Sequence, residues 1–104
     1  MIMDDNYAFK NIDEETKLKV WSKGKVITQK GKEYDPKIWR MDVLGNVMKY
    51  SEHGNTKSVH GWEIDHIVPK SKGGTDEVSN LQPLQWEDNR KKGDVLPAIS
   101  KDNK

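Results

Sequence analysis

The sequence predicts one small α+β domain, with a helix near its start, short strands in its middle and a second short helix near its end. Three observations lead to this prediction. The chain has 104 residues, a usual size for a single domain. Helix start and stop signals occur in two separate places. Between them, short runs rich in β-branched and aromatic residues are separated by glycine, proline and asparagine, which is typical of antiparallel strands.

The first helix is predicted over residues 13–23. Asp13 is a suitable N-terminal cap, the two glutamates that follow it place negative charge in the first turn, and Gly24 can end the helix. Residues 24–36 then read as an irregular loop that could hold a brief strand at residues 26–27.

The strands are predicted in two groups. Residues 38–43 and 47–51 form a lead-in hairpin around Leu44-Gly45-Asn46, which tolerates a left-handed backbone. Residues 62–68 form a further strand, which Pro69 ends because it cannot donate to a ladder. Residues 78–84 can supply only a short or edge strand, since Pro83 interrupts them.

The second helix is predicted over residues 87–92, with acids at its start, bases at its end and Gly93 as its stop. The sequence shows no repeat, linker or second domain, so residues 1–104 are predicted to be one domain. The polar ends, residues 1–12 and 98–104, are expected to be frayed tails.

Composition excludes several classes of protein. Without cysteine the chain cannot contain disulfides, zinc ribbons, iron–sulfur clusters or a cysteine nucleophile. No run approaches the roughly 20 apolar residues of a membrane span, and the start of the sequence is acidic rather than laid out like a signal peptide. We therefore expect a cytoplasmic protein with no membrane partner.

Charge is distributed unevenly along the chain. Lysine and arginine total 18 against 17 acidic residues, but residues 17–40 hold eight bases and two acids. This basic segment could attract a polyanion, because each neutralised phosphate releases counterions. Charge alone favours the alternative that it is a solvated, lysine-rich surface.

The residues that indicate chemistry lie between positions 62 and 93. Asp65 and His66 end a predicted strand, a glycine-rich loop follows, Asn80 begins the next strand and Asn89 lies within the second helix. Phosphodiester hydrolysis needs a base for water and a cation for the phosphate oxygens. His66 could be the base, while Asp65 and the amide oxygen of Asn89 could hold a hard divalent ion.

Each of these residues also has an ordinary structural interpretation. An Asp-His pair is more often a hydrogen-bonded structural pair, and Asn80 could simply begin a turn. Asn89 is more informative, because asparagine is unfavourable inside a helix and a broken rule there points to a site.

The segment from Trp62 to Gly93, WEIDHIVPKSKGGTDEVSNLQPLQWEDNRKKG, resembles the motif of the HNH endonuclease family. Residues 39–42 and Gly45 resemble, more loosely, the lead-in hairpin of small stand-alone bacterial or phage HNH proteins. The resemblance implies a ββα-metal (His-Me finger) module, with residues 62–93 as its core.

The resemblance also implies a role for each motif residue. His66 corresponds to the general base, Asp65 to the metal-binding acid and Asn80 to the asparagine that braces the loop and orients the base. Asn89 takes a place where many members have histidine, so the chain is an HNN variant, as in the HNH domain of RNA-guided nucleases. A neutral oxygen ligand there favours Mg²⁺ or Mn²⁺ over Zn²⁺ or Ni²⁺. The family's frequent paired CxxC zinc staples are absent from this sequence.

The implied activity is a metal-dependent endonuclease that hydrolyses DNA, expected to be double-stranded, by a one-metal mechanism that leaves 5′-phosphate and 3′-hydroxyl ends. Basic residues near the motif are candidates for phosphate contact, although the last three could equally complement the helix end. These candidates are Arg40, Lys70, Lys72, Arg90, Lys91 and Lys92.

One geometrical difficulty is visible in the sequence. Consecutive residues of a regular strand point to opposite faces, so Asp65 and His66 can address one phosphate only if the strand twists or ends there. His53 and His60 lie outside the motif and are expected to be structural or solvated. Trp62 and Trp86 are expected to be core residues rather than base-stacking platforms, and Glu87 to be a first-turn acid.

Two other functions remain open on the sequence alone. The basic segment of residues 17–40 is compatible with a nucleic-acid-binding module that lacks turnover. The small size of the chain is compatible with an accessory subunit of a larger nuclease or packaging complex, which would require a protein partner.

Overall fold

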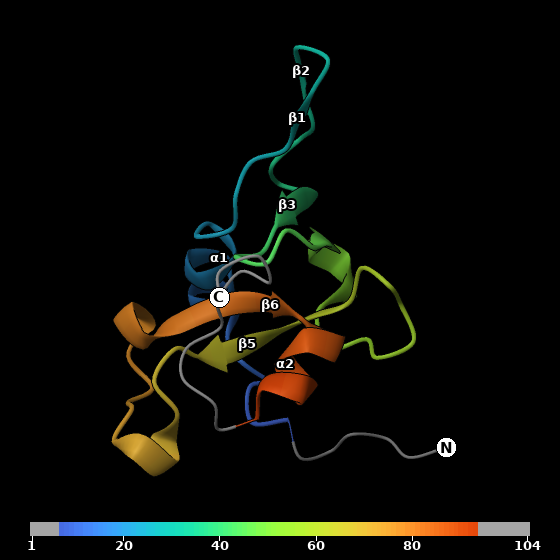
Figure 1. Ribbon diagram of the computed structural model, residues 1–104. Coiled ribbons are helices and arrows are strands. Elements are labelled where there is room, and N and C mark those ends of the chain that lie inside the picture. The colour runs from blue at the N-terminus through green and yellow to red at the C-terminus, as the bar shows by residue number, and fades with distance from the viewer. Residues whose placement is uncertain (1–6, 94–104) are drawn as a thin grey trace.

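The computed structural model describes residues 7–93 and confirms a small α+β fold (Figure 1). None of the helices in this part of the chain is long and apolar enough to span a membrane. In chain order the helices and strands are α1 (Glu14–Trp21), β1 (Thr28–Gln29), β2 (Lys32–Glu33), β3 (Trp39–Met41), β4 (Val47–Lys49), β5 (Trp62–His66), β6 (Leu81–Gln85) and α2 (Trp86–Lys92). Short 3₁₀ turns at Tyr50–Glu52, Lys70–Lys72 and Val78–Asn80 connect them.

Helix α1 forms where its capping signals predict it. The carboxylate of Asp13 accepts a hydrogen bond from the backbone N–H of Thr16 at 3.0 Å and so satisfies one of the free donors of the first turn. The helix buries Val20 and Trp21 at its C-terminal end. It ends slightly earlier than predicted, with Ser22 as its C-terminal cap.

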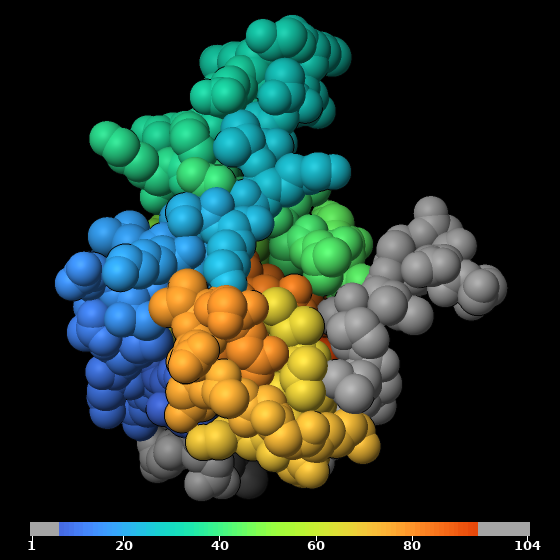
Figure 2. Space-filling model, turned by 90° about the vertical axis from the view of Figure 1, so that its left-hand side faces the viewer, coloured from blue at the N-terminus to red at the C-terminus, as the bar shows by residue number. Residues whose placement is uncertain are grey.

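The segment expected to be an irregular loop contains a two-stranded hairpin instead. Strands β1 and β2 pair through Gln29 and Lys32, so only two residues connect them. Both connecting residues have positive φ, 53° at Lys30 and 77° at Gly31, as the tight turns that suit the strand twist require. The strands are therefore at residues 28–29 and 32–33, not at 26–27. The hairpin projects from the body of the protein (Figures 1 and 2).

The lead-in hairpin is confirmed as antiparallel strands β3 and β4, in which Arg40 is opposite Met48. The buried carboxylate of Asp42 shapes the turn between them. It accepts hydrogen bonds from the backbone N–H groups of Leu44 and Asn46 at 3.0 and 2.8 Å. Gly45 supplies the left-handed conformation that the turn needs, with φ of 89°.

Strands β5 and β6 form the central antiparallel pair, and α2 follows β6 without a loop, so the three elements make a ββα unit. The side chain of Gln85 caps α2 by accepting from the N–H groups of Glu87 and Asp88. The period of β5 places Trp62 and Ile64 on one face and Glu63 and Asp65 on the other. The first pair belongs to the apolar core that includes the end of α1, whereas the second pair contacts α2.

The core is built from apolar residues of four elements, α1, β4, β5 and β6. Its buried members are Val20, Trp21, Met48, Trp62, Ile64 and Leu81. Residues 7–12 pack against it through Tyr7, Phe9 and Ile12, although a frayed tail was expected over residues 1–12. The reason is that this short segment contains two aromatic rings, and the hydroxyl of Tyr7 accepts a hydrogen bond from the N–H of Ile64. The remaining predicted tails, residues 1–6 and 98–104, lie outside the described residues.

The side of β6 that faces away from β5 is blocked at three positions. The ammonium of Lys23 donates to the carbonyl of Leu81 at 2.7 Å, and also to that of Val78. Pro83 has no N–H, and the N–H of Gln85 donates to the carboxylate of Asp42 at 2.8 Å. The predicted interruption by Pro83 is therefore tolerated because this side of the strand faces no further strand.

Candidate functional site

A cavity of about 420 Å³ lies beside the ββα unit, and three predicted site residues line it. Asp65 and His66 reach it from β5, and Asn89 reaches it from α2. Residues 7–9 and 69–71 complete the wall. Three of the predicted basic residues also line it, Lys70, Arg90 and Lys92.

Asp65 is buried, with 6% of its surface exposed, and both of its carboxylate oxygens are engaged. Oδ1 lies 3.1 Å from Nζ of Lys92, which is equally buried, and Oδ2 accepts from Nε2 of Gln82 at 2.9 Å. Nζ of Lys92 also donates to the backbone carbonyl of His66 at 3.0 Å. The negative charge of this carboxylate is therefore compensated inside the protein.

His66 is partly buried and is held between a ring and a carboxylate. Its ring lies 5.2 Å from that of Phe9, centroid to centroid, and its Nε2 is 2.7 Å from Oδ1 of Asp76. Hydrogen bonds from His66 and Lys70 hold the pKa of Asp76 below its ordinary value, so this carboxylate is ionised near neutral pH. An ionised carboxylate can only accept, so Nε2 carries the proton and Nδ1 of a neutral ring keeps a free lone pair.

Asn80 braces the loop between β5 and β6. Its Oδ1 accepts from the N–H of Val68 at 2.9 Å, while its Nδ2 donates to the carbonyls of Val68 and Thr75 at 3.0 and 2.8 Å. Gly74 must be glycine here, because a Cβ atom would meet the carbonyl oxygen of Val68 at 1.7 Å. The amide thereby ties Val68 to Thr75, the residue directly before Asp76.

Asn89 is held by a residue that the sequence argument missed. Its Nδ2 donates to Oε1 of Glu63 at 2.8 Å, and Nε of Arg90 donates to the same oxygen at 2.9 Å. The guanidinium of Arg90 also pairs with Oε2 of Glu63. A carboxylate cannot donate, so the nitrogen end of the Asn89 amide must face Glu63, and the oxygen end faces away from it.

The geometrical difficulty at Asp65 and His66 is resolved by the end of the strand. Asp65 points to the α2 side of β5, whereas His66 is the last residue of the strand and contacts Phe9 and Asp76. Both residues line the same cavity, because the chain leaves the sheet directly after His66.

The oxygen donors at the cavity suit a hard divalent cation. Asp65 offers a carboxylate and Asn89 an amide oxygen, and such ions bind a few protein oxygens together with water. Residues 7–93 contain no cluster of three or more histidine and acidic residues that could hold a metal ion by themselves. A cation at this site would thus depend on the amide, on water and on substrate oxygens.

The other predicted basic residues lie outside the cavity. The guanidinium of Arg40 donates to the carbonyls of Pro36 and Gly24 at 3.0 and 2.9 Å, which ties the base of the projecting hairpin to the body. Lys72 and Lys91 are exposed. Nucleic-acid contact by these residues stays a prediction.

The remaining histidines and the predicted core tryptophans have structural environments. His53 bonds to the hydroxyl of Tyr7 at 2.9 Å, and its ring lies 4.8 Å from that of Trp62, centroid to centroid, at a tilt of 55°. Burial lowers the pKa of His53 to about 4. His60 contacts the carbonyl of Val47 through Nδ1 at 3.1 Å. Trp86 is half-buried and does not belong to the apolar core, so the expectation that it is a core residue is wrong. Its indole N–H donates to the carbonyl of Ser58 at 2.8 Å.

Three residues important to the site were not predicted, Glu63, Asp76 and Gln82. Strand alternation could have indicated Glu63, because it lies two residues before Asp65 and so shares its face. Gln82 is opposite Asp65 in the register of β5 and β6. No sequence signal indicates Asp76, which meets His66 only through the fold of the loop.

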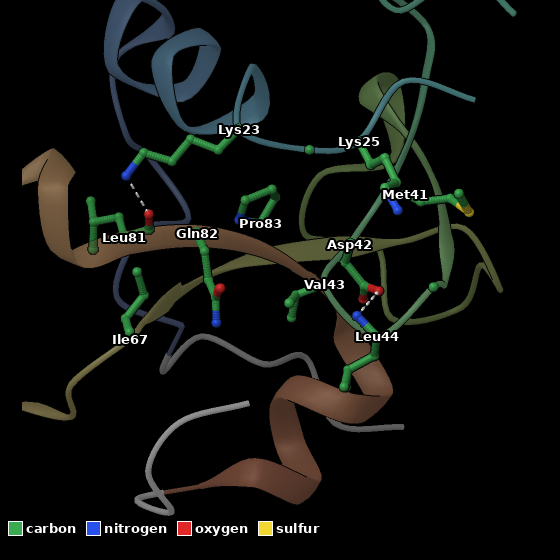
Figure 3. A pocket seen from close by; sticks show the side chains of 12 residues that line it. Lys23, Lys25, Met41, Asp42, Val43, Leu44, Ile67, Leu81, Gln82 and Pro83 are labelled. Carbon is green, nitrogen blue, oxygen red and sulfur yellow. Dashed lines mark hydrogen bonds between the residues drawn. The ribbon is translucent and has the colours of Figure 1, made fainter. Parts of the chain in front are cut away.

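A larger cavity of about 530 Å³ lies elsewhere, between β6, the β3–β4 turn and the segment after α1 (Figure 3). The carboxylate there, Asp42, is already engaged by backbone N–H groups, and the Lys23 ammonium donates to backbone carbonyls. The residues known to line it include no histidine. Of these two cavities the smaller one is therefore the candidate site, because it combines an imidazole with a carboxylate and a helix-borne amide.

Phosphodiester hydrolysis requires a base for water and a cation for the phosphate oxygens. The cavity groups an imidazole with carboxylate and amide oxygens, which are the residue types that such chemistry uses. Residues 51–95 match the family model for HNH endonuclease, which confirms the predicted family for this part of the chain. The match indicates a nuclease, and therefore a nucleic acid as substrate. No curated protein and no solved structure matches the chain.

Proposed function

We propose that the protein is a metal-dependent endonuclease that hydrolyses DNA phosphodiester bonds and leaves 5′-phosphate and 3′-hydroxyl ends. The observation that carries this proposal is the position of His66. Its Nε2 is held by Asp76 at 2.7 Å, in a cavity that Asp65 and Asn89 also line.

His66 acts as the general base in this proposal. Because Asp76 fixes the proton on Nε2, Nδ1 is the atom that accepts a proton from the attacking water. The imidazolium that forms is stabilised by the carboxylate of Asp76, which lies 2.7 Å away. Asn80 contributes by holding the loop that carries Asp76.

Asp65 and Asn89 would hold one Mg²⁺ or Mn²⁺ through their oxygens. When bound, such an ion supplies positive charge to the phosphate oxygens and to the departing 3′ oxygen. Lys70 and Arg90 add positive charge at the cavity wall, where they can contact the same phosphate. Glu63 orients the amide of Asn89 so that its oxygen is available.

Double-stranded DNA is the proposed form of the substrate. The support is the projecting β1–β2 hairpin and the basic segment of residues 17–40 that contains it. This segment holds eight basic and two acidic residues. Neutralisation of phosphates by such a segment gives binding that depends on salt rather than on sequence. We therefore expect weak sequence specificity.

A plasmid-nicking assay with Mg²⁺ or Mn²⁺ tests the activity. We expect nicking that EDTA abolishes and that His66→Ala lowers by about 10² to 10⁴-fold. His60→Ala is the matched control, since His60 lies outside the cavity and should retain activity. DNA ligase should reseal the nicks, because it requires a 5′-phosphate beside a 3′-hydroxyl. Full activity in His66→Ala, or no cleavage with any divalent ion, would contradict the proposal.

The observation that Lys92 and Gln82 engage both oxygens of Asp65 favours a second candidate, a nucleic-acid-binding module or accessory subunit without turnover. Such a protein would bind DNA in a salt-dependent manner, and neither Mg²⁺ nor His66→Ala would change its affinity. A stable protein partner recovered with the chain would favour the accessory role.

A further inference from the structure

Lys92 is placed unusually for a residue near the end of a short exposed helix. Only 5% of its side chain is exposed, and its ammonium lies 3.1 Å from Oδ1 of Asp65 and 3.0 Å from the carbonyl oxygen of His66. The two adjacent basic residues of α2 differ, since Lys91 is exposed and Arg90 pairs with Glu63. The Lys92 ammonium therefore contacts the same carboxylate that would bind the metal ion in the proposed function.

Lys92 and a divalent ion would compete for the Asp65 carboxylate. Oδ2 already accepts a hydrogen bond from Gln82, so Oδ1, which Lys92 contacts, is the less occupied oxygen apart from that ammonium. An ammonium and a dication on one oxygen repel each other strongly where water is scarce. Binding of the ion is therefore disfavoured while Lys92 stays at Asp65.

We propose that Lys92 is a built-in competitor of the divalent cation: its ammonium holds Asp65 until the ion binds and then moves into the cavity. This inference rests on the proposed metal-dependent function. It makes Lys92 a residue that sets the affinity and charge selectivity of the site. A singly charged ion gains little by displacing the ammonium, because the two carry the same charge. A dication gains more, because its attraction to the carboxylate is stronger.

The cavity and the chemistry of lysine allow this movement. Lys92 lines the 420 Å³ cavity, so its flexible stem has space into which it can turn. Arg90 has no such freedom, because its planar group binds Glu63 through two nitrogens. The two ion pairs thus have different roles: the Arg90 pair holds Asn89 in place, and the Lys92 pair opens.

The competition is tested by titrating the full chain with Mn²⁺ and measuring the loss of the EPR signal of the free ion. We expect Lys92→Met to bind Mn²⁺ about tenfold more tightly or better, because the wild-type site is open for only a fraction of the time. Lys91→Met is the matched control, since it removes the same charge from the next position of α2 and should change affinity less than about twofold. Equal or weaker binding by Lys92→Met would overturn the inference.

A measurement on the wild-type chain avoids the risk that Lys92→Met folds poorly without metal. Acetylation by a lysine-reactive ester, read by mass spectrometry, should modify Lys92 slowly in EDTA and at least about threefold faster with saturating Mg²⁺. Lys91 should react at the same rate in both. An unchanged Lys92 rate under conditions where Mn²⁺ or Mg²⁺ binds would overturn the inference.

The outcomes separate the inference from the proposed function. Cleavage that depends on metal, together with equal Mn²⁺ affinity in wild type and Lys92→Met, would overturn the competition and leave the nuclease in place. If Lys92→Met binds Mn²⁺ more tightly but the wild-type protein cleaves no DNA, the competition is supported and the nuclease is refuted. If no variant binds Mn²⁺, both fail.

Discussion

The two faces of strand β5 are both buried, but by different chemistry. Trp62 and Ile64 face the core, with 0% and 2% of their surfaces exposed, and pack against apolar side chains. Glu63 and Asp65 are buried almost as completely, at 1% and 6%, but each contacts a cation of α2. Burial of apolar surface stabilises a fold, whereas a buried ion pair gives little net stability. The comparison indicates that the apolar face contributes more to stability than the charged face, whose two acids line the candidate cavity.

The apolar face should carry the largest stability effect. Trp62→Ala removes a fully buried ring and should lower the free energy of unfolding by about 3 to 5 kcal/mol. Urea denaturation followed by far-ultraviolet circular dichroism measures this change. Val59→Ala is a suitable control, because Val59 is 70% exposed. A loss below about 1 kcal/mol would show that the core does not depend on this face.

The charged face should show a different pattern, in which the loss depends on which partner is removed. Arg90→Met leaves the charge of Glu63 buried and should lower the free energy of unfolding by about 3 kcal/mol. The double variant Glu63→Leu/Arg90→Met removes both charges and should recover at least half of that loss. If the double variant is as unstable as the single one, the pair itself stabilises the fold and the contrast between the faces fails.

Asn80 braces the loop that carries Asp76, the hydrogen-bond partner of His66. Asn80→Asp keeps the acceptor for Val68 but places a carboxylate against the two carbonyls that the amide nitrogen now serves. We expect the free energy of unfolding to fall by about 2 kcal/mol. Nicking activity should also fall, even at temperatures where the variant is fully folded. Ser79→Ala, at the exposed neighbouring position, should change neither quantity much. Full activity in Asn80→Asp would show that the loop does not need this brace.

The pH dependence of stability tests the apolar face again, through His53. Burial lowers the pKa of His53 to about 4 in the folded state, against 6.5 for the free side chain. The unfolded chain therefore binds more protons between these values, and stability falls as the pH is lowered from 6.5 towards 4. After allowance for partial exposure, the loss from pH 7 to pH 5 is about 1 kcal/mol.

The variant His53→Gln isolates this contribution, because glutamine does not titrate and can still accept from Tyr7. Urea unfolding at pH 7 and pH 5 should show a smaller pH dependence for the variant than for the wild type. Equal dependence in the two proteins would mean that His53 is not held neutral by its contact with Trp62 and Tyr7.

The smallest effect is expected at Asp76, which is exposed and lies on neither face. In Asp76→Asn an amide N–H can donate to Nε2 of His66. The ring can then carry its proton on Nδ1, the nitrogen that is proposed to accept a proton from water. Nicking should fall by about fivefold at pH 7, with thermal stability close to that of the wild type. Glu77→Gln, the adjacent exposed acid, is the control. Undiminished cleavage in Asp76→Asn would mean that Asp76 does not set the tautomer.

Much of the fold could be predicted because its signals are local. Asp13 caps α1 through a residue three positions away, and Asp42 with Gly45 shapes the β3–β4 turn within five residues. The β1–β2 hairpin was missed because its Lys30-Gly31 turn departs from the usual asparagine-glycine pair. Residues 7–12 were misjudged for a different reason: their packing depends on Trp62 and Ile64, which are more than fifty positions away.

The candidate site was predictable only where the motif fixes the residues. Asp65, His66 and Asn89 line one cavity, as the resemblance implied, and Asn80 braces the loop. The groups that control them are not local in sequence. Lys92 reaches Asp65 across 27 positions, Arg90 reaches Glu63 across the same separation, and Asp76 meets His66 across a loop. Their roles follow from tertiary pairing of charges, which residue type and spacing do not encode.

The blocked side of β6 has a consequence for how molecules of this protein meet one another. The edge strand of a sheet has unpaired backbone N–H and C=O groups that can pair with a strand of another copy. Repetition of that pairing builds fibres. Here an ammonium, a proline ring and a carboxylate occupy the groups that such a strand would need. The β6 side of the central pair is therefore closed to a strand from another copy, so the protein can reach high local concentration without extending this sheet on that side.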